Sequence, residues 1–367
     1  MESCEIKVGT FFSGVGSPEQ ALKNLVEGGA EVKNKPLEIE IEFACEIDKY
    51  AEQTYLKNFK PKKFYSDITT LEMKDLSYVD LLVFGFPCQA FSVAGKRQGF
   101  DDTRGTLFYD ALRYLQEHRP RYFVAENVRG LVSHDNGKTF GTIIDCLAKT
   151  TNYQMSLMPF ENLGYHIHHK VLNTKNFGIP QNRERIFIIG IRDDEDNNFN
   201  FPKEIPLECK LRDILQNNVS EKYYLSDKAV KGIENSTYER KKHIIQHTDV
   251  CATLLGRDYK DPKCIETKGA SLRTYPRTTN PEKDKEQGRN KRLETRKDDL
   301  ANSITTHEHD SLIKNKRVRR LTPIECERLQ GFPDNFTEGV SDTQRYKQMG
   351  NTISVPVIET ILENLLQ

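Results

Sequence analysis

Strand-like and helix-like segments alternate along the first 200 residues, and this alternation constrains the fold more than any other feature of the sequence. Apolar runs typical of buried strands occur at residues 6–12, 39–47, 80–86, 121–127, 169–174 and 183–191. Amphipathic segments typical of helices occur at residues 17–26, 49–59, 106–118 and 138–149. This order predicts an α/β fold with a mostly parallel, doubly wound sheet and helices on both of its faces. Ligands of such sheets bind beyond the carboxyl ends of the strands.

The composition changes near residue 200 and regains a regular pattern only at Leu321. Residues 200–321 contain few apolar runs, so they form either a small irregular domain or a largely disordered insertion. The net formal charge of the chain is zero, but residues 257–320 carry 18 Lys and Arg against 11 Asp and Glu. That excess of positive charge favours a phosphate-facing surface, with a solvated charged face as the alternative.

A capped helix is predicted directly after this polar region. In TPIECERLQG, Thr322 suits the N-cap, Pro323 suits the first helical position, and Glu325 occupies the matching capping-box position. A last amphipathic segment, residues 354–367, is expected to form a helix that packs back on the first part of the chain.

Several features favour a cytoplasmic protein. No stretch has the roughly 18 consecutive apolar residues of a membrane-spanning helix, and the first residues lack the order of a signal peptide. The eight cysteines are widely spaced and include no C-x-x-C pair, which predicts reduced thiols instead of a disulfide framework. We therefore expect an intracellular location without a membrane partner.

Small residues follow the first strand in FFSGVGSPEQAL. Gly14 and Gly16 let a ligand approach the backbone, and a helix that begins near Ser17 offers free N–H groups. Glu19 stands where the G-x-G-x-x-G pattern has its third glycine, so an ordinary strand-to-helix turn is an equal alternative. Glu46 ends the second strand, where an acidic residue commonly accepts hydrogen bonds from a ribose. Together these features predict a small nucleoside-containing cofactor.

Cys88 and Glu126 follow the third and fourth predicted strands, and so belong to the same edge of the sheet. A thiol with a pKa of about 8.5 is mostly protonated at neutral pH, so a nucleophilic Cys88 needs an electropositive, partly exposed site. A small buried hydrophobic residue is the commoner role of a cysteine. Apolar surroundings raise the pKa of a carboxyl group and would let Glu126 donate a proton, whereas a helix N-cap or a salt bridge is its structural alternative.

The segment NFGIPQNRERIFIIG places charged residues at the entrance of a strand. Strand alternation puts Gln181, Arg183 and Arg185 on one face, and Asn182 and Glu184 on the other. Two neighbouring guanidinium groups are costly unless they meet an anion, a carboxylate or a base edge. Surface salt bridging is the alternative.

One pattern of histidine and cysteine residues is a candidate metal site. HIIQHTDVC spaces His243, His247 and Cys251 four residues apart, so on a helix they would share a face, and Cys264 follows later. The pattern matches no strong zinc signature, and we predict no metal.

Taken in order, these segments resemble the motifs of the DNA cytosine-5 methyltransferases of bacterial or phage type. The resemblance extends over almost the whole chain and rests on FFSGVGSPEQAL, CEID, SDI, GFPCQAFSVAGKRQGFDDTRGTLFYDALR, AENVRGLVSHDNG, GIPQNRERIFIIG, RRLTPIECERLQGFPDNF and YKQMGNTISVPV. It implies a Rossmann-like, S-adenosylmethionine-dependent methyltransferase domain at residues 1–199. It also implies a smaller target-recognition domain at residues 200–335 and a C-terminal segment, residues 336–367, that returns to the catalytic domain.

The resemblance also implies a mechanism. Cys88 would attack C6 of a cytosine that is flipped out of duplex DNA, Glu126 would protonate or hydrogen-bond N3, and Arg185, with Arg183 beside it, would hold O2. The methyl group would come from S-adenosylmethionine, leaving S-adenosylhomocysteine, without a metal.

Further residues follow from the same motifs. The cofactor residues implied are Phe12, Gly14, Gly16, Glu46, Ile47, Asp67, Ile68, Pro87, Leu107 and Asn351. The DNA-contacting residues implied are Ser92, Arg97, Arg257, Lys260, Arg273 and Arg277. Ser17 stands where family members often have glycine, and Ile47 where some carry an aromatic residue.

Other members of the family suggest two alternatives to a DNA-modifying enzyme. One is a transfer RNA methyltransferase, although the Cys-Phe-Thr tripeptide typical of that branch is not in this sequence. The other is an inactive DNA-binding relative, against which Cys88, Glu126 and Arg185 argue. We expect a monomer that acts on double-stranded DNA, with a cognate restriction endonuclease as a possible partner.

Overall fold

The computed structural model of the protein describes most of the chain. The described residues are 3–87, 107–148, 163–226, 250–256, 258, 263–266 and 318–367, together with short strands at 244–245, 270–275, 290–295 and 313–314.

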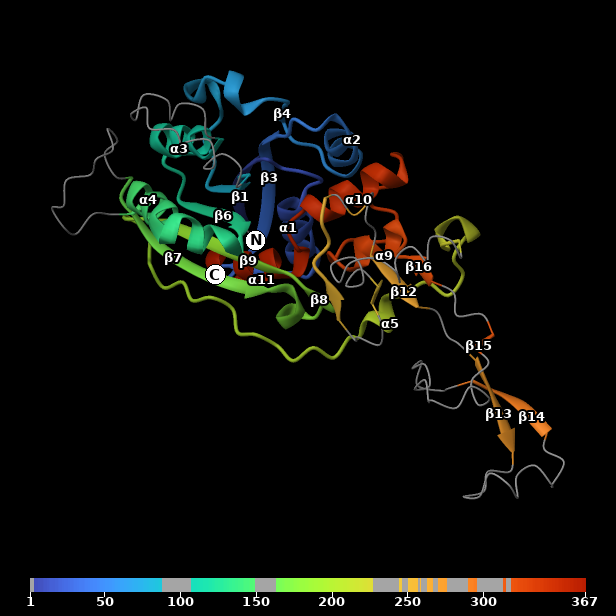
Figure 1. The fold of residues 1–367 in the computed structure, drawn as a ribbon. Helices are drawn as coiled ribbons and strands as arrows, with labels where there is room; N and C mark the ends of the chain where they lie inside the picture. The colour runs from blue at the N-terminus through green and yellow to red at the C-terminus, as the bar shows by residue number, and fades with distance from the viewer. Residues whose placement is uncertain are drawn as a thin grey trace.

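One eight-stranded sheet organises the first part of the chain (Figure 1). Its strands are β1 (Cys4–Phe11), β2 (Glu31–Val32), β3 (Lys35–Cys45), β4 (Lys63–Tyr65), β5 (Leu81–Gly85), β6 (Tyr122–Val128), β7 (Tyr165–Asn173) and β9 (Glu184–Arg192). The spatial order is β2-β3-β1-β5-β6-β9-β7, and β4 pairs with β3. β1, β3, β4, β5 and β6 run parallel, whereas β2, β7 and β9 pair antiparallel with their neighbours. The mixed α/β class predicted from the sequence is confirmed.

Helices pack on both faces of this sheet because its central strands are apolar on both sides. The longer helices are α1 (Ser17–Glu27), α2 (Lys49–Asn58), α3 (Leu107–His118), α4 (Lys138–Leu147), α10 (Asp342–Asn351) and α11 (Val355–Leu366). Leu81 and Val83 of β5 belong to one buried cluster with residues of α1, α2 and α11. Leu82 and Phe84 belong to a second cluster with residues of α3 and α4. Alternate side chains of one strand therefore contribute to two cores.

The antiparallel direction of β9 has a simple cause. Between β7 and β9 the chain forms only η7 (Thr174–Phe177) and β8 (Gln181–Asn182), which is too short for the crossover that a parallel pair needs. β9 consequently begins where β6 ends, and Arg185 pairs with Val128 in the strand register. This register brings a basic residue to the carboxyl edge of the parallel strands.

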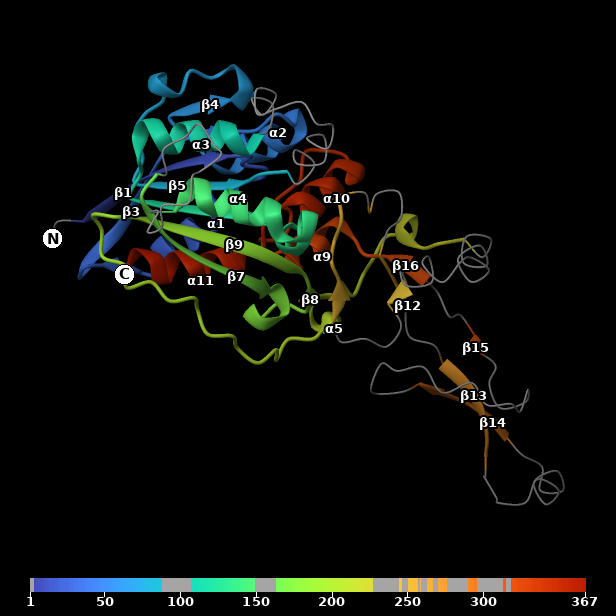
Figure 2. The same ribbon diagram turned by 60° about the vertical axis from the view of Figure 1, so that its left-hand side comes forward.

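The described parts of residues 200–321 form α5 (Leu211–Ile214), η8 (Glu221–Tyr223) and several short strands. β10 (Ile244–Ile245), β12 (Cys264–Glu266) and β16 (Val318–Arg320) make one sheet, and β14 (Asn290–Thr295), β13 (Ala270–Tyr275) and β15 (Ile313–Lys314) make another. The second of these sheets lies apart from the main sheet in both views (Figures 1 and 2). β11 (Cys251–Ala252) pairs with β8 of the first part of the chain. Of the residues His243, His247 and Cys251, only Cys251 lies within the described ranges, on β11.

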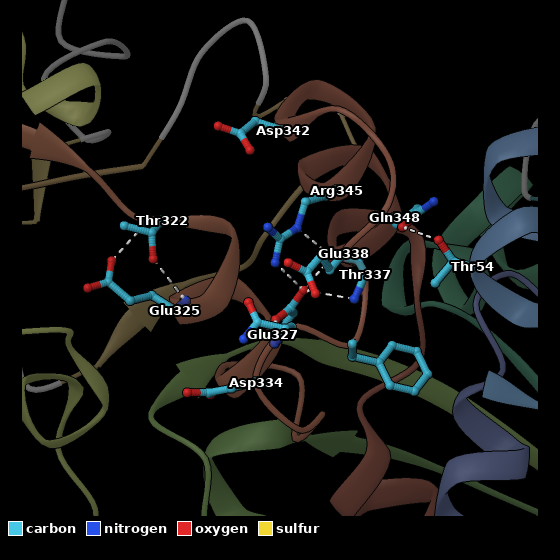
Figure 3. A network of polar contacts seen from close by, with 12 residues as sticks. Thr54, Thr322, Glu325, Glu327, Asp334, Thr337, Glu338, Asp342, Arg345 and Gln348 are labelled. Carbon is cyan, nitrogen blue, oxygen red and sulfur yellow. Dashed lines mark hydrogen bonds and ion pairs between the residues drawn. The ribbon is translucent and has the colours of Figure 1, made fainter. Parts of the chain in front are cut away.

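The predicted capping box is confirmed at α9 (Pro323–Arg328). The Glu325 amide donates to Thr322 Oγ1 at 3.2 Å, and the Thr322 amide donates to Glu325 Oε2 at 2.8 Å. In the same helix, Glu327 accepts hydrogen bonds from Arg345 Nη2 at 2.7 Å and from the Thr337 amide at 3.0 Å (Figure 3). These buried contacts fix the chain between α9 and α10.

The last two helices pack on the first part of the chain, as expected for residues 354–367. Thr54 of α2 donates to Gln348 Oε1 of α10 at 3.2 Å (Figure 3). Asn24 of α1 donates to Glu359 Oε2 of α11 at 2.7 Å. The two helices thereby complete the core on one face of the sheet.

No helix among the described residues is long and apolar enough to cross a membrane. The seven cysteines of the described ranges are all free, in agreement with the reduced thiols predicted from their spacing.

Candidate active site at the carboxyl edge of the sheet

The carboxyl ends of the parallel strands carry most of the residues singled out from the sequence. Phe12 and Gly14 follow β1, Glu46 follows β3, Asp67 follows β4 and Pro87 follows β5. Because these strands are parallel, their ends meet at one edge of the sheet, as predicted.

The turn after β1 needs its glycines for two different reasons. Gly14 has a φ of 56°, and a side chain at this position would project into open space. Gly16 has a φ of 91°, and a Cβ here would lie 2.4 Å from the ring of Phe59. Gly14 therefore leaves room for a ligand, whereas Gly16 permits close packing and ends the turn as the N-cap of α1.

Glu46 is held against this turn. Its Oε2 accepts a hydrogen bond from the Gly14 amide at 2.8 Å, and its Oε1 accepts one from the Asp48 amide at 2.8 Å. Burial raises the pKa of the Glu46 carboxyl, and the two amide hydrogen bonds oppose that shift. Each carboxylate oxygen keeps a lone pair for a further donor.

A pocket lies between this turn and the end of α10. It contains about 390 Å³ of empty space, part of it open to solvent. Its walls include Phe12, Gly14, Glu126 and Asn351, which the sequence motifs predicted. Four wall residues that sequence reasoning missed are Thr10, Ser13, Thr352 and Ile353. A short polar residue after a strand was the only available signal for Ser13, whereas Thr10 lies within β1.

Glu126 faces this pocket and forms an ion pair with Arg185. Arg185 Nε lies 3.1 Å from Glu126 Oε1, and the two side chains are 15% and 11% exposed. Burial raises the pKa of the Glu126 carboxyl, and the positive charges of Arg185 and Arg183 oppose that shift. A carboxyl group in these surroundings is suited to hold a proton and donate it. The salt bridge given as an alternative role for Glu126 is therefore also present, and its partner is Arg185.

Arg183 has a different environment from Arg185. Gln181 and Arg183 are buried on one face while Asn182 is exposed, which confirms the predicted alternation for these residues. The guanidinium of Arg183 donates to backbone carbonyl oxygens of Leu254, Gly350 and Thr352. Its role as a catalytic residue stays a prediction.

Asn127, in the AENV segment, makes structural hydrogen bonds that the sequence reasoning left unassigned. Its Nδ2 donates to the Phe86 carbonyl at 2.8 Å, and its Oδ1 accepts from the Val128 amide at 2.8 Å. It therefore fixes the backbone that leads from β5 to Pro87.

The sequence matches the C-5 cytosine-specific DNA methylases over residues 6–367. Type II methyltransferase M1.ScrFI of Lactococcus lactis subsp. cremoris is 38% identical over 336 residues, which span 89% of this chain and 72% of the relative. Type II methyltransferase M.DsaV of Dactylococcopsis salina is 34% identical, over 100% of this chain and 87% of its own. The chain belongs to the C-5 cytosine-specific DNA methylases. It is a DNA (cytosine-5) methyltransferase.

Solved structures agree with this methyltransferase in fold. A crystal structure of a Spodoptera frugiperda DNMT2 mutant has a TM-score of 0.65 at 19% identity, covering 99% of this chain and 100% of the other. The Entamoeba histolytica methyltransferase EhMeth has a TM-score of 0.64 at 20% identity, covering 99% and 98%.

Other predicted residues of the methyltransferase lie at the same edge but outside the pocket walls. Ile47 is 74% exposed beside Glu46, and Pro87 is exposed beyond β5. Ile68 is buried, and Leu107 is half-buried at the start of α3. Asp67 accepts hydrogen bonds from Thr69, which lower the pKa of its carboxyl.

The remaining predicted residues of the methyltransferase are not placed at this edge. Arg273 lies on β13. The residues that lie outside the described ranges are Cys88, Ser92, Arg97, Arg257, Lys260 and Arg277.

Proposed function

We propose that this methyltransferase converts a cytosine at a specific site of duplex DNA to 5-methylcytosine, with Cys88 bound covalently to C6 during the reaction. The observation that carries the proposal is the buried ion pair of Glu126 with Arg185, in which Glu126 lines a pocket at the end of β5. Cys88 follows Pro87 directly in the sequence, and Pro87 lies at that strand end. Cys88, Glu126 and Arg185 would act on the base, with Arg183 beside them.

The pocket fits S-adenosylmethionine as the cofactor. Its walls combine the backbone of the Gly14 turn with the side chains of Phe12 and Asn351. Gly14 opens the backbone to the ligand, and Glu46 has lone pairs for ribose hydroxyl groups. The exposed side chain of Ile47 offers an apolar surface for the adenine. When bound there, S-adenosylmethionine would supply the activated methyl group that C5 receives.

Cys88, Glu126 and Arg185 would then act on different atoms of the cytosine. The Cys88 thiolate adds to C6, and the electron pair displaced from the C5–C6 bond makes C5 nucleophilic. Glu126 donates a proton or hydrogen bond to N3, and Arg185 donates to O2, so that both stabilise the charge that develops on the ring. Once C5 has received the methyl group, C5 loses its proton to a proton acceptor. The electron pair then returns to the ring and Cys88 is expelled from C6. Extruding the base from the duplex costs a few kcal/mol.

Residues 200–335 would serve as the target-recognition domain, between the catalytic domain at 1–199 and the returning segment at 336–367. The excess of Lys and Arg in residues 257–320 supports phosphate contacts. The basic residues Arg257, Lys260, Arg273 and Arg277 are candidates for these contacts or for base readout, and Ser92 and Arg97 would also contact DNA.

The relatives support a role in restriction and modification. Several carry the name Type II methyltransferase, and one, of Bacillus phage SPR, is named an orphan methyltransferase. We infer that the protein acts as a cytoplasmic, nucleoid-associated monomer. It either protects the sites of a cognate restriction endonuclease or works as an orphan or phage enzyme.

Trapping the covalent bond to Cys88 tests the mechanism. DNA that contains 5-fluorocytosine should form an adduct stable to denaturation, because fluorine at C5 cannot leave as a proton does. The Cys88→Ser variant should form no adduct and transfer no methyl groups, while it still binds DNA. An active enzyme that cannot be trapped, or full methyl transfer by the serine variant, would refute this mechanism.

Bisulfite sequencing of DNA from cells that express the protein tests its specificity. Unconverted cytosines in one fixed sequence context are expected. Unconverted cytosines in no fixed context would contradict a site-specific enzyme.

A further inference from the structure

Arg183 joins backbone segments that are far apart in the sequence. Its Nη1 donates to Leu254 O at 2.9 Å and to Gly350 O at 3.2 Å. Its Nη2 donates to Gly350 O at 3.3 Å and to Thr352 O at 2.6 Å. The residue is 2% exposed, so water does not compete freely for these hydrogen bonds. One planar guanidinium therefore holds three carbonyl groups together.

One of the two segments forms a wall of the pocket. α10 ends at Asn351, and the last carbonyl groups of a helix have no partner within the helix. Arg183 satisfies two carbonyls at this end, those of Gly350 and Thr352. Asn351 and Thr352 line the pocket. The side chain of Arg183 thus supports the pocket wall from behind.

The other segment, Leu254–Gly256, belongs to the proposed recognition domain and packs against the pocket wall without spare room. A Cβ added at Gly350 would lie 2.1 Å from the carbonyl carbon of Leu255. A Cβ added at Gly256 would lie 2.2 Å from Asn351 Oδ1. Because atoms packed this closely transmit displacements, a shift of Leu254–Gly256 must also move Asn351 or the end of α10.

Arg183 and Arg185 therefore differ in what they contact, although both lie near Glu126. Arg185 forms the ion pair with Glu126, and its Nη1 donates a hydrogen bond to the Glu184 carbonyl at 2.8 Å. Arg183 directs its two terminal nitrogens to carbonyl groups, and its buried Nε has no hydrogen-bond partner. Burial lowers the pKa of Arg183 to about 9, with Arg185 adding to the shift and Glu126 opposing it. Arg183 is therefore a buried cation at the contact between Leu254–Gly256 and the end of α10.

We propose that Arg183 is a positioning residue that couples the recognition domain to the cofactor pocket, so that bound DNA changes the affinity for the cofactor. The inference rests on the proposed function, since it takes residues 200–335 as the DNA-binding part. By thermodynamic linkage, the cofactor changes the affinity for DNA by the same factor.

The Gly256→Ala variant tests the coupling from outside the pocket. The added methyl group meets the end of the Asn351 side chain, which can turn away, so the protein should fold while its pocket is altered. Gly141→Ala is the matched control, because a Cβ at Gly141 of α4 meets no atom within 4 Å. Arg183→Lys and Arg183→Met test the guanidinium itself, and the lysine variant should be less impaired because it can still donate to one or two carbonyls.

The measurement is the dissociation constant of S-adenosylhomocysteine, by calorimetry, with and without a duplex that contains the methylated site. In the wild type, DNA should change this constant by a factor of about 5 to 150. Gly256→Ala and Arg183→Met should bring the factor close to one, whereas Gly141→Ala should leave it unchanged. Circular dichroism and the melting temperature identify variants that do not fold.

Two negative results have separate meanings. If the wild type binds no S-adenosylhomocysteine, the proposed function fails together with the inference. If the wild type binds it and folded Gly256→Ala shows the wild-type DNA effect, only the inference is overturned. An equal loss in Gly141→Ala would also overturn it.

Discussion

Replacing Glu126 by glutamine removes the negative charge of this side chain and keeps its size and shape. Arg185 Nε lies 3.1 Å from Glu126 Oε1 in surroundings where both side chains are largely buried. At that distance and an effective dielectric constant of about 20, the attraction between two unit charges is about 5 kcal/mol. Glutamine removes this attraction and leaves the Arg185 guanidinium buried without an anion. It also removes the cost of burying the carboxylate, which acts in the opposite direction.

Because the pKa of the Glu126 carboxyl is raised despite Arg185, the burial cost outweighs the attraction, and we expect the Glu126→Gln variant to match or exceed the wild type in unfolding free energy near pH 8. Loss of the proton donor should lower the rate of methyl transfer by a factor of about 10² to 10⁴. Urea denaturation measures the first quantity, and transfer of labelled methyl groups to DNA measures the second.

Glu184→Gln is the matched control for this variant. Glu184 Oε2 lies 2.7 Å from Arg129 Nη1, but the side chains of Arg129 and Glu184 are 65% and 40% exposed. An exposed pair contributes about 0–1 kcal/mol, so this variant should be close to the wild type in stability and in rate. If the two variants cannot be distinguished, the reasoning about Glu126 is refuted.

Two further predictions concern buried charges. Burial raises the pKa of the Glu19 carboxyl above its ordinary value of 4.5, so the stability that this group contributes is present below that value and is lost as the pH rises through the raised pKa. Glu19→Gln should therefore match the wild type in urea denaturation near pH 4 and exceed it near pH 8; an advantage that is equal at both pH values would contradict this. Arg319 donates to both carboxylate oxygens of Glu325 at 2.7 and 2.8 Å in full burial, so Arg319→Met should cost about 3–5 kcal/mol in the same assay. The double variant with Glu325→Gln should recover part of that loss, and no recovery would show that the lost interaction is not ionic.

Local patterns in the sequence predicted the elements of the fold well, because strand and helix periods depend on neighbouring residues. The strands at β1, β3, β5 and β6 and the helices α1 to α4 occur where apolar and amphipathic patterns placed them. The capping box at Thr322 is equally local, since its two partners lie three residues apart. The position of Glu46 and Glu126 at one edge follows from the parallel direction of their strands.

Other features depend on contacts that no local pattern encodes. The sequence shows that β9 is a strand, but its antiparallel direction depends on the short link from β7 and on its place beside β6. The pocket is lined by Gly14 and Asn351, which come from opposite ends of the chain. Sequence motifs predicted this pairing only through resemblance to a family. Thr352 and Ile353 were missed although they follow Asn351 directly in the YKQMGNTISVPV segment.

Arg183 and Arg185 show most clearly where local prediction ends. Their spacing determined that both side chains lie on one face of a strand, because side chains alternate with a period of two. Only the tertiary structure decided that Arg185 pairs with Glu126 and that Arg183 holds the carbonyls of Leu254, Gly350 and Thr352. The physical reason is that a guanidinium is satisfied by whichever acceptors the folded chain brings within hydrogen-bond distance. Those acceptors come from segments far away in the sequence.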